Sequence, residues 1–349
     1  MSKYRTASYE LEIAPGLKEA VLAELAQWQS STTHSGHELI QLDYSGDPQH
    51  LAQLKTVNAV YLRHTFAVPR PKALLGHQHF QRLVTLIETV MRYNPPGSFQ
   101  TLHIDAAGSD SSVMQRLKTE LAVSAGLLTT TDDEKGDLLI RLRRSLNGTP
   151  DAAEGWDALV RLTPRPSATR TWRVQNYEGA LNAAVAHAMV LMTRPAPTDV
   201  FLNICCGSGT LLIERMSAGD AQAVIGCDIA PIALSFAQLN LEAARLAPQL
   251  LHADARRLPL ADSSVDALCA DLPFGQLIGS HHANERLYPA VLTEAARVAR
   301  PEARFVIVTH EIRLMESLLR HQLNWRQVSE PLKITLNGLH PRIYTLRRT

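Results

Sequence analysis

Six short apolar runs in the second half of the sequence alternate with helix-patterned segments, and this alternation constrains the fold most strongly. The predicted strands cover 200–204, 223–227, 249–252, 265–269, 305–309 and 344–346, and the predicted helices cover 180–193, 210–218, 231–244, 287–299 and 312–322. Strands that are apolar almost throughout are typical of parallel strands buried on both faces. We therefore predict an α/β domain over residues 176–349, with a doubly wound sheet and a ligand site at the carboxyl ends of its strands.

The first half of the sequence has a different pattern. Residues 1–65 mix period-two runs with helical spacing, which predicts a small α+β unit. A proline-containing break at 69–71 precedes a second α+β pattern, and residues 163–173 read as an extended linker. We therefore predict three domains, at 1–65, 66–175 and 176–349.

The composition limits which partners such a chain can hold. Lys and Arg number 35 against 34 Asp and Glu, so a strongly basic nucleic-acid coat is excluded and any RNA must meet a local patch. No stretch approaches the roughly 20 apolar residues of a membrane span. The four cysteines lack the paired spacing of a zinc site, which predicts a reduced, cytoplasmic protein without a metal.

The first predicted strand of the second half leads into the glycine-rich turn Cys206-Gly207-Ser208-Gly209-Thr210. Glycines let the chain turn tightly and bring bare backbone close to a ligand, and the start of the next helix offers free N–H groups. Leu212 stands where a dinucleotide fingerprint needs a third glycine, which disfavours a nicotinamide cofactor. An ordinary tight turn is the alternative.

Acidic residues follow the next two predicted strands. Asp228 ends the strand after the glycine turn, where a carboxylate can accept both hydroxyls of a ribose; the alternative is a helix cap. Asp254 follows the third strand, where it can accept the amino group of adenine while the N–H of Ala255 meets a ring nitrogen. The alternative for Asp254 is a loop carboxylate that balances Arg256 and Arg257.

The fourth predicted strand ends in Asp271-Leu272-Pro273-Phe274-Gly275. A carboxylate and a peptide carbonyl at this point can accept the two hydrogens of a planar NH2 group, while the phenyl ring stacks on the attached heterocycle. Pro273 restricts Leu272 to extended geometry, which helps to aim the carbonyl. Acceptors on both hydrogens favour a pyramidal nitrogen and its developing positive charge. This pattern predicts attack on an electrophile by the lone pair of a planar exocyclic amine; the alternative is a Pro-Gly turn with a core Phe.

The ordered motifs resemble the class I S-adenosylmethionine-dependent methyltransferases that modify exocyclic amines, and within them the THUMP-containing RNA guanine-N2 methyltransferases. Residues 13–17 are similar to the opening of that family's ferredoxin-like N-terminal piece, residues 66–175 resemble a THUMP domain, and residues 287–288 and 297–298 match its helix after the catalytic loop. The resemblance implies a Rossmann-like α/β methyltransferase domain preceded by α+β ferredoxin-like and THUMP units. It also implies S-adenosyl-L-methionine as cofactor and an RNA substrate, with tRNA as the expected class.

The resemblance implies site residues as well. The implied cofactor site consists of Asn203, Cys206, Gly207, Ser208, Gly209, Thr210, Asp228, Ile229, Asp254 and Ala255. The implied catalytic loop consists of Asp271, Leu272, Pro273 and Phe274. The turn departs from the family's pattern, because Asn203 stands where the family usually has Asp and Ile204 where it has Pro. The change removes a charge beside the methionine end of the cofactor.

A local excess of arginine supplies the expected RNA patch. Residues 141–173 contain seven arginines and three acidic residues, and the planar arginine fork binds two phosphate oxygens at once. The predicted RNA contacts are Arg141, Arg143, Arg144, Arg165, Arg170 and Arg173. A solvated strand edge followed by a linker is the alternative.

Two other functions remain open on the sequence alone. The same loop serves other planar amines, namely adenine N6, cytosine N4 or a protein glutamine amide. A non-catalytic RNA-binding protein with a decayed methyltransferase fold is the second alternative, and Asn203 is the feature that favours it.

Overall fold

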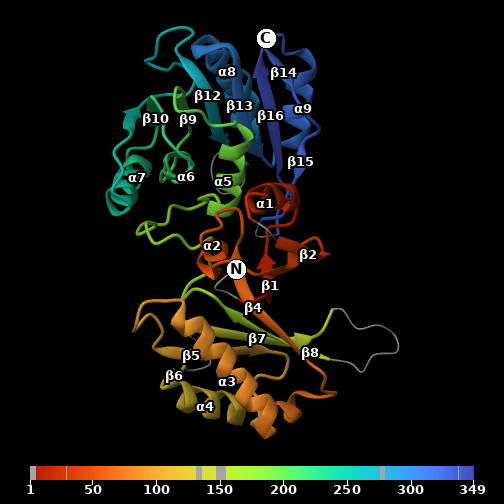
Figure 1. The fold of residues 1–349 in the computed structure, drawn as a ribbon. Coiled ribbons are helices and arrows are strands. Elements are labelled where there is room, and N and C mark those ends of the chain that lie inside the picture. The colour runs from red at the N-terminus through yellow and green to blue at the C-terminus, as the bar shows by residue number, and fades with distance from the viewer. Residues whose placement is uncertain (1–4, 29, 131–135, 147–154, 276–279, 337) are drawn as a thin grey trace. The chain divides into compact units, whose positions relative to one another are not determined.

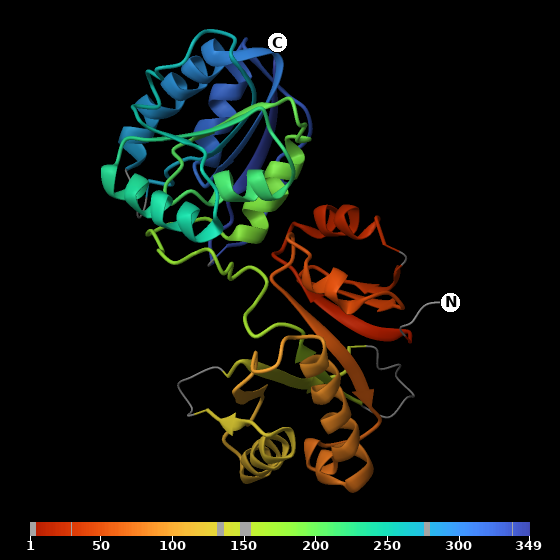
Figure 2. The same ribbon diagram turned by 60° about the vertical axis from the view of Figure 1, so that its left-hand side comes forward.

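The structure, a computed structural model, describes residues 5–28, 30–130, 136–146, 155–275, 280–336 and 338–349. The chain forms two compact units, drawn in Figures 1 and 2. Unit 1 comprises Met1–Ile13 and Val21–Ser167, and unit 2 comprises Ala14–Ala20 and Ala168–Thr349. Among the described residues, no helix is both long and apolar enough to cross a bilayer.

Unit 1 is built on one eight-stranded sheet in the order β2-β3-β1-β4-β8-β7-β5-β6. Its strands are β1 (Ala7–Glu12), β2 (Ser30–Ser35), β3 (Leu39–Tyr44), β4 (Ala59–Phe66), β5 (Thr101–Ala106), β6 (Leu128–Thr129), β7 (Leu138–Arg144) and β8 (Trp156–Arg161). Its helices are α1 (Lys18–Leu25), α2 (Pro48–Ala52), the 3-10 helix η1 (Pro71–Leu75), α3 (His77–Arg92) and α4 (Ser112–Ala125).

Strand β4 joins the two segments that the sequence analysis placed in separate domains. Its residues 59–63 pair with β1, and its residues 61–66 pair with β8. Most of the 1–65 and 66–175 segments therefore share one sheet, and the division into three domains stays a prediction. The identification of these segments as ferredoxin-like and THUMP domains stays a prediction.

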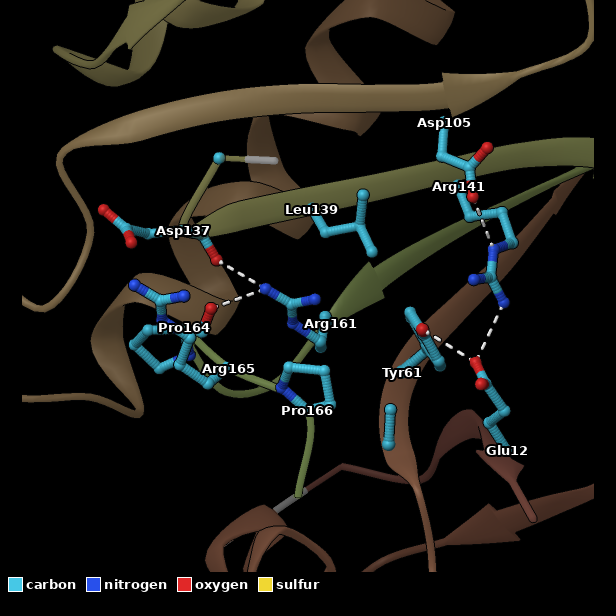
Figure 3. Close-up of a pocket in the computed structure, with 12 residues that line it drawn as sticks. Glu12, Tyr61, Asp105, Asp137, Leu139, Arg141, Arg161, Pro164, Arg165 and Pro166 are labelled. Carbon is cyan, nitrogen blue, oxygen red and sulfur yellow. Dashed lines mark hydrogen bonds and ion pairs between the residues drawn. The ribbon is translucent and has the colours of Figure 1, made fainter. Parts of the chain in front are cut away.

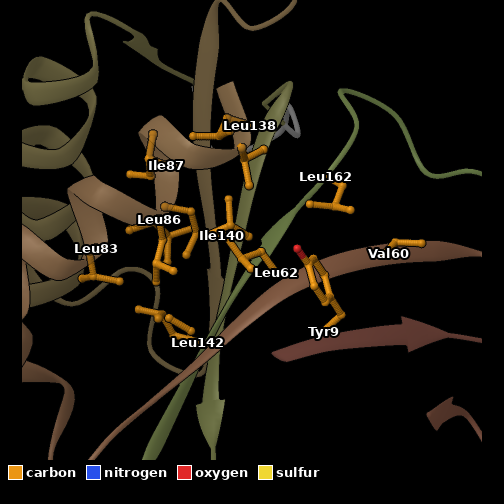
Figure 4. Close-up of a cluster of buried hydrophobic side chains, with 14 of the residues drawn as sticks. Tyr9, Val60, Leu62, Leu83, Leu86, Ile87, Leu138, Ile140, Leu142 and Leu162 are labelled. Carbon is orange, nitrogen blue, oxygen red and sulfur yellow. The ribbon is translucent and has the colours of Figure 1, made fainter. Parts of the chain in front are cut away.

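The core of unit 1 lies between its sheet and helix α3. Leu138, Ile140 and Leu142 alternate along β7 with one side chain between each pair, as period-two geometry requires, and all three are buried. Figure 4 shows them beside Leu83 and Ile87 of α3, which follow helical spacing. This packing fixes β7, the strand that carries three of the predicted RNA-binding arginines.

Unit 2 is built on an eight-stranded sheet in the order β11-β10-β9-β12-β13-β16-β14, with β15 paired to β16 off this path. Its strands are β9 (Val200–Ile204), β10 (Ala223–Asp228), β11 (Gln249–His252), β12 (Val265–Asp271), β13 (Ala299–Thr309), β14 (Trp325–Gln327), β15 (Leu332–Lys333) and β16 (Arg342–Arg348). Its helices are α5 (Ala183–Met192), α6 (Thr210–Ser217), α7 (Pro231–Ala244), α8 (His281–Val298) and α9 (Ile312–His321).

Helices cover both faces of this sheet, as the apolar strands require. Leu202 and Leu268 pack in one cluster with residues of α8 and α9, whereas Phe201, Cys269 and Val306 pack in another with residues of α5 and α6. Strands β9 to β13 run parallel, and β16 runs antiparallel to β13. The order reverses at β9, which has β10 on one side and β12 on the other, so the ligand site is expected at their carboxyl ends.

Some elements differ from the predicted ones. Helix α8 begins at His281 instead of residue 287 and holds Pro289 in its interior. A proline is tolerated best in a first turn, so the sequence pattern favoured a later start. The short strands β14 and β15 have too few residues to show a periodic pattern, and they were not predicted.

Candidate active site

The glycine turn follows β9 directly and leads into α6. Cys205, Gly207 and Gly209 all have positive φ, at 53°, 52° and 84°. A side chain at Gly209 would be doubly unfavourable, because its Cβ would also lie 3.3 Å from the Cβ of Ala237. The turn therefore depends on glycine for both its backbone conformation and its close packing on α7.

Asp228 lies at the end of β10, beside the glycine turn. One carboxylate oxygen accepts a hydrogen bond from the Gly207 N–H at 2.8 Å, and the other accepts one from the Ala230 N–H at 2.9 Å. Each oxygen keeps a further lone pair, so the half-buried carboxylate can still accept ribose hydroxyls. The structure thus brings Asp228 and the predicted turn together.

Two buried oxygens in this region have no hydrogen-bond partner among the described residues, namely Asn203 Oδ1 and Ser208 Oγ. The amide of Asn203 donates to the backbone carbonyls of Ile204 and Cys269, at 3.2 Å each. A carboxylate here would have no donor for those carbonyls, so Asn suits this position. Unpaired buried polar atoms are costly, which is consistent with a polar ligand at this turn.

The other predicted cofactor residues, Ile229, Asp254 and Ala255, differ in their exposure and in their hydrogen bonds. The side chain of Ile229 is 61% exposed, which suits a residue that awaits an apolar partner. Ala255 is buried. Both carboxylate oxygens of Asp254 accept hydrogen bonds from the Arg256 guanidinium, and this pairing lowers the pKa of Asp254. Of the two alternatives for Asp254, the structure contains the loop ion pair.

The predicted catalytic loop leaves the sheet at the carboxyl end of β12. Asp271 is the last residue of that strand, and the Leu272 N–H donates to the Val308 carbonyl at 3.2 Å. Within the described residues, the Leu272 carbonyl has no hydrogen-bond donor. Phe274 is half-buried, with its ring centroid 6.1 Å from that of His310. The loop thus keeps its predicted carbonyl acceptor unpaired.

Burial raises the pKa of Asp271 to about 7. Removal of water from around the carboxylate disfavours its charged form, and this burial accounts for the raised pKa. A carboxyl group whose pKa lies near neutrality, in a predicted site, is a common mark of a functional residue. The carboxylate is therefore partly protonated at pH 7.

Residues of α8 and β13 that the sequence analysis did not identify hold this loop. The Pro273 carbonyl accepts hydrogen bonds from Asn284 Nδ2 at 2.8 Å and from the Tyr288 hydroxyl at 2.7 Å. The Tyr288 hydroxyl also meets Thr309 Oγ1 at 2.6 Å. Because two donors fix the Pro273 carbonyl, the preceding Leu272 peptide is held in one orientation. The signal that could have identified Asn284 and Tyr288 in the sequence is that they are polar residues on an otherwise apolar face of α8.

Four predicted RNA-binding arginines lie in unit 1. Arg141 pairs with Glu12 at 3.0 Å and Asp105 at 3.1 Å, and Arg143 pairs with Glu10. Arg144 is exposed and stacks over the Trp156 ring, 5.8 Å from its centroid.

Arg165 lies in a pocket on the same unit. Figure 3 shows it beside Pro164 and Pro166, near Arg161. Arg165 is exposed, and it forms no ion pair among the described residues. The pocket combines arginines with the carboxylates of Glu12, Asp105 and Asp137, so it is not a uniformly basic patch.

Arg170 and Arg173, the other two predicted RNA contacts, lie in unit 2 and form hydrogen bonds there. Arg170 pairs with Glu214 at 2.8 Å, and both side chains are largely buried. Arg173 donates to Thr210 Oγ1 at 3.0 Å and to the Leu181 carbonyl at 2.8 Å. Both guanidinium groups thus form hydrogen bonds within unit 2, and their contact with RNA stays a prediction.

No group of three or more His, Cys, Asp or Glu residues in the described part of the chain is arranged to hold a metal ion. His281, in the pair that follows the catalytic loop, contacts Glu311 at 2.8 Å. The prediction that the reaction needs no metal is not tested by this.

Residues 170–340 match the protein family described as UPF0020: RMKL-like, methyltransferase domain. This part of the chain is therefore similar to a methyltransferase domain of that family. The match covers the glycine turn, both acidic strand ends and the catalytic loop of the methyltransferase domain. It begins at Arg170, close to the start of the second part of unit 2.

Relatives of known name share this domain. The mouse protein named tRNA (guanine(6)-N(2))-methyltransferase THUMP3 is 32% identical over 184 residues, which are 48% of this chain and 36% of that protein. The Thermus thermophilus tRNA (guanine(6)-N2)-methyltransferase is 27% identical over 191 residues, covering 54% of this chain and 56% of that protein. The bovine U6 snRNA (guanine-N(2))-methyltransferase THUMPD2 is 32% identical over 133 residues, covering 38% of this chain and 26% of that protein. The matches thus span between about a quarter and about half of these relatives.

Solved structures share the fold over nearly the whole chain. TrmN from Thermus thermophilus has a TM-score of 0.73 and 19% identity, and the match covers 99% of this chain and 100% of that one. A possible methylase from Clostridium difficile 630 has a TM-score of 0.67 and 13% identity, with 99% of each chain covered. The class I methyltransferase fold predicted for the second half is confirmed.

Proposed function

We propose that the chain is an S-adenosylmethionine-dependent methyltransferase that acts on the exocyclic N2 amine of a guanosine in RNA, with tRNA as the substrate class. The observation that carries this proposal is the loop at the end of β12. Asp271, Leu272 and Phe274 lie at or just beyond the carboxyl end of that strand, and among the described residues no backbone N–H donates to the Leu272 carbonyl. The similarity to named guanine-N2 methyltransferases of tRNA and U6 snRNA supports guanine as the base and RNA as its carrier.

The cofactor site of this proposal consists of the glycine turn and the two following strand ends. Asp228 accepts the ribose hydroxyls, Asp254 and the Ala255 N–H contact the adenine, and the turn lies against the methionine end. The unpaired oxygens of Asn203 and Ser208 fit a polar ligand at that end. When bound, S-adenosylmethionine supplies an electrophilic methyl group.

The protein residues prepare the amine for attack. The ionised Asp271 carboxylate and the Leu272 carbonyl accept the two N–H hydrogens, which draws the nitrogen lone pair out of the ring's π system and directs it at the methyl group. The same acceptors stabilise the positive charge that develops on nitrogen. Phe274 stacks on the base, which must leave its own stack to reach the loop. Asn284 and Tyr288 keep the loop in this conformation through the Pro273 carbonyl.

The proposal gives unit 1 the role of holding the RNA. Arg144 and Arg165 are the exposed arginines of the predicted patch, and Arg141 and Arg143 contribute although each is paired with a carboxylate. Contacts of arginine with phosphate position the nucleic acid without reading its sequence and weaken with salt. A THUMP domain over residues 66–175 and a cytoplasmic location belong to the same proposal.

The test is to incubate the full chain with labelled S-adenosylmethionine and an unmodified tRNA pool, then to identify the labelled nucleoside by mass spectrometry. We expect N2-methylguanosine. Asp271→Ala should abolish incorporation, whereas the matched control Asp262→Ala, which removes an exposed carboxylate paired with Arg297, should not. A U6 snRNA transcript tests the second class of RNA. Label on adenine or cytosine would refute the guanine proposal, and no incorporation into either RNA would refute the RNA proposal.

A further inference from the structure

The segment 170–177, which we call the strap, lies against the glycine turn and the helix that follows it. It precedes α5 and is drawn in yellow-green in Figure 1. Near its start, Arg170 pairs with Glu214 in the last part of α6 at 2.8 Å. Arg173 donates to the side chain of Thr210, the first residue of α6, at 3.0 Å. Successive strap residues therefore meet progressively earlier residues of α6.

The next contact is made through Asn240, a fully buried residue of α7. Its Oδ1 accepts from the Gln175 N–H at 2.8 Å, and its Nδ2 donates to the Gln175 carbonyl and to the Ser208 carbonyl, at 3.0 Å each. One side chain thus ties the backbone of the strap to the backbone of the glycine turn. Both polar atoms of the Asn240 side chain are used in these bonds, since Oδ1 accepts one and the NH2 group donates two.

The strap ends on the turn itself. A Cβ added to Gly207 would lie 4.0 Å from Cδ1 of Tyr177, so the tyrosine ring stands beside the glycine. The ring of Phe236 on α7 meets Tyr177 edge-on, with centroids 6.0 Å apart. Residues of α7 therefore contact the strap at two points, Asn240 at Gln175 and Phe236 at the Tyr177 ring.

We propose that the strap sets the conformation of the cofactor turn, with Asn240 as the positioning residue that connects them. This inference rests on the proposed function, because it assumes that the turn binds the cofactor. Among the described residues, the side-chain hydrogen bonds of Asn240 go to backbone groups of the strap and the turn, so it acts through the turn. Removing its side chain leaves the buried Ser208 carbonyl and the half-buried Gln175 N–H without these partners.

The coupling must be reciprocal. If a docked strap favours cofactor binding, then bound cofactor must favour the docked strap by the same free energy. The Gln175 amide reports docking directly, since its hydrogen bond to Asn240 protects it from exchange with solvent. A purely structural role for Asn240 would give no change in this amide when the cofactor product binds.

The experiment measures S-adenosylhomocysteine binding to the full chain by calorimetry and amide exchange of residues 170–177 with and without that ligand. We expect Asn240→Ala to weaken binding about tenfold, the effect of leaving buried polar groups unpaired. We expect the ligand to slow exchange at Gln175 in the wild type and to have less effect in the variant. The matched control is Gln238→Ala, which removes an exposed side chain from the same helix.

A second variant guards against misfolding of the first. Arg173→Gln leaves α7 unchanged and removes the bond to Thr210, and it should weaken binding by a smaller factor, about threefold. Wild-type affinity in folded Asn240→Ala, with only a lower melting temperature, would overturn the inference and leave the proposed function intact. No binding of S-adenosylhomocysteine by the wild type would overturn both.

Discussion

The substitution Asp271→Asn should stabilise the protein while it removes activity. Burial raises the pKa of this carboxyl to about 7 in the folded chain, against an ordinary value of 3.8. The folded state therefore holds its proton to a higher pH than the unfolded chain does. Because the folded state binds more protons between these two pKa values, stability falls as pH rises from about 4 to about 7 and then levels off. An amide at this position avoids the cost of ionisation.

The magnitude follows from the difference between the two pKa values. About three pKa units at 1.36 kcal/mol each give an upper limit of about 4 kcal/mol at pH 8. The carboxylate is partly exposed, so about half of this, ~2 kcal/mol, is the expected gain for Asp271→Asn. Less than half of that gain remains at pH 5, where the Asp271 carboxyl is ionised in the unfolded chain and protonated in the folded one.

Thermal unfolding at pH 5 and pH 8 measures the effect. For a unit of this size ~2 kcal/mol corresponds to a rise of about 4–8 °C in melting temperature. Methyl transfer should fall by about 10²–10³-fold, as it does when one preorganised charge-stabilising group is removed from other enzymes. An equal shift in melting temperature at both pH values, or a lower melting temperature at pH 8, would refute the assigned burial of the charge. Retained activity would refute the catalytic role.

Four further predictions concern the same loop and the RNA patch. In the wild type, kcat/KM should fall about tenfold per pH unit below pH 7, because Asp271 must be ionised; a profile flat from pH 5 to 8 would contradict this. Phe274→Ala should lower kcat/KM for RNA by the equivalent of about 1–3 kcal/mol, because it removes base stacking, whereas Phe274→Tyr should retain it. The affinity for S-adenosylhomocysteine should stay unchanged in both variants. Tyr288→Phe should lower kcat with little change in RNA affinity, because the Pro273 carbonyl loses one donor; steady-state kinetics compare the two constants. Arg165→Ala should reduce the dependence of RNA affinity on log salt by about one unit in a filter-binding titration, and an unchanged slope would remove Arg165 from the patch.

The sequence determined the strands, the turn and the catalytic loop of the second half, because these features are local. Apolar periodicity placed β9 and β11 at their observed bounds, and Gly207 and Gly209 indicated a tight turn, where the structure has positive φ at both. Since parallel strands present their carboxyl ends at one edge, the order of motifs also predicted that the turn, Asp228 and Asp271 would lie at that edge. The roles of these residues as ligands stay predictions.

The tertiary structure decided which polar side chains are available and which hold the fold. Arg170 has the same local surroundings in sequence as an exposed arginine, and only folding brings it to Glu214, 44 positions away. Asn240 carries no motif, and for Tyr288 the sequence indicated a helix but no partner, yet packing aims them at the Ser208 and Pro273 carbonyls. The direction of a side chain and the residue it meets across the fold depend on how helices pack on the sheet, which the spacing of residues along the chain does not encode.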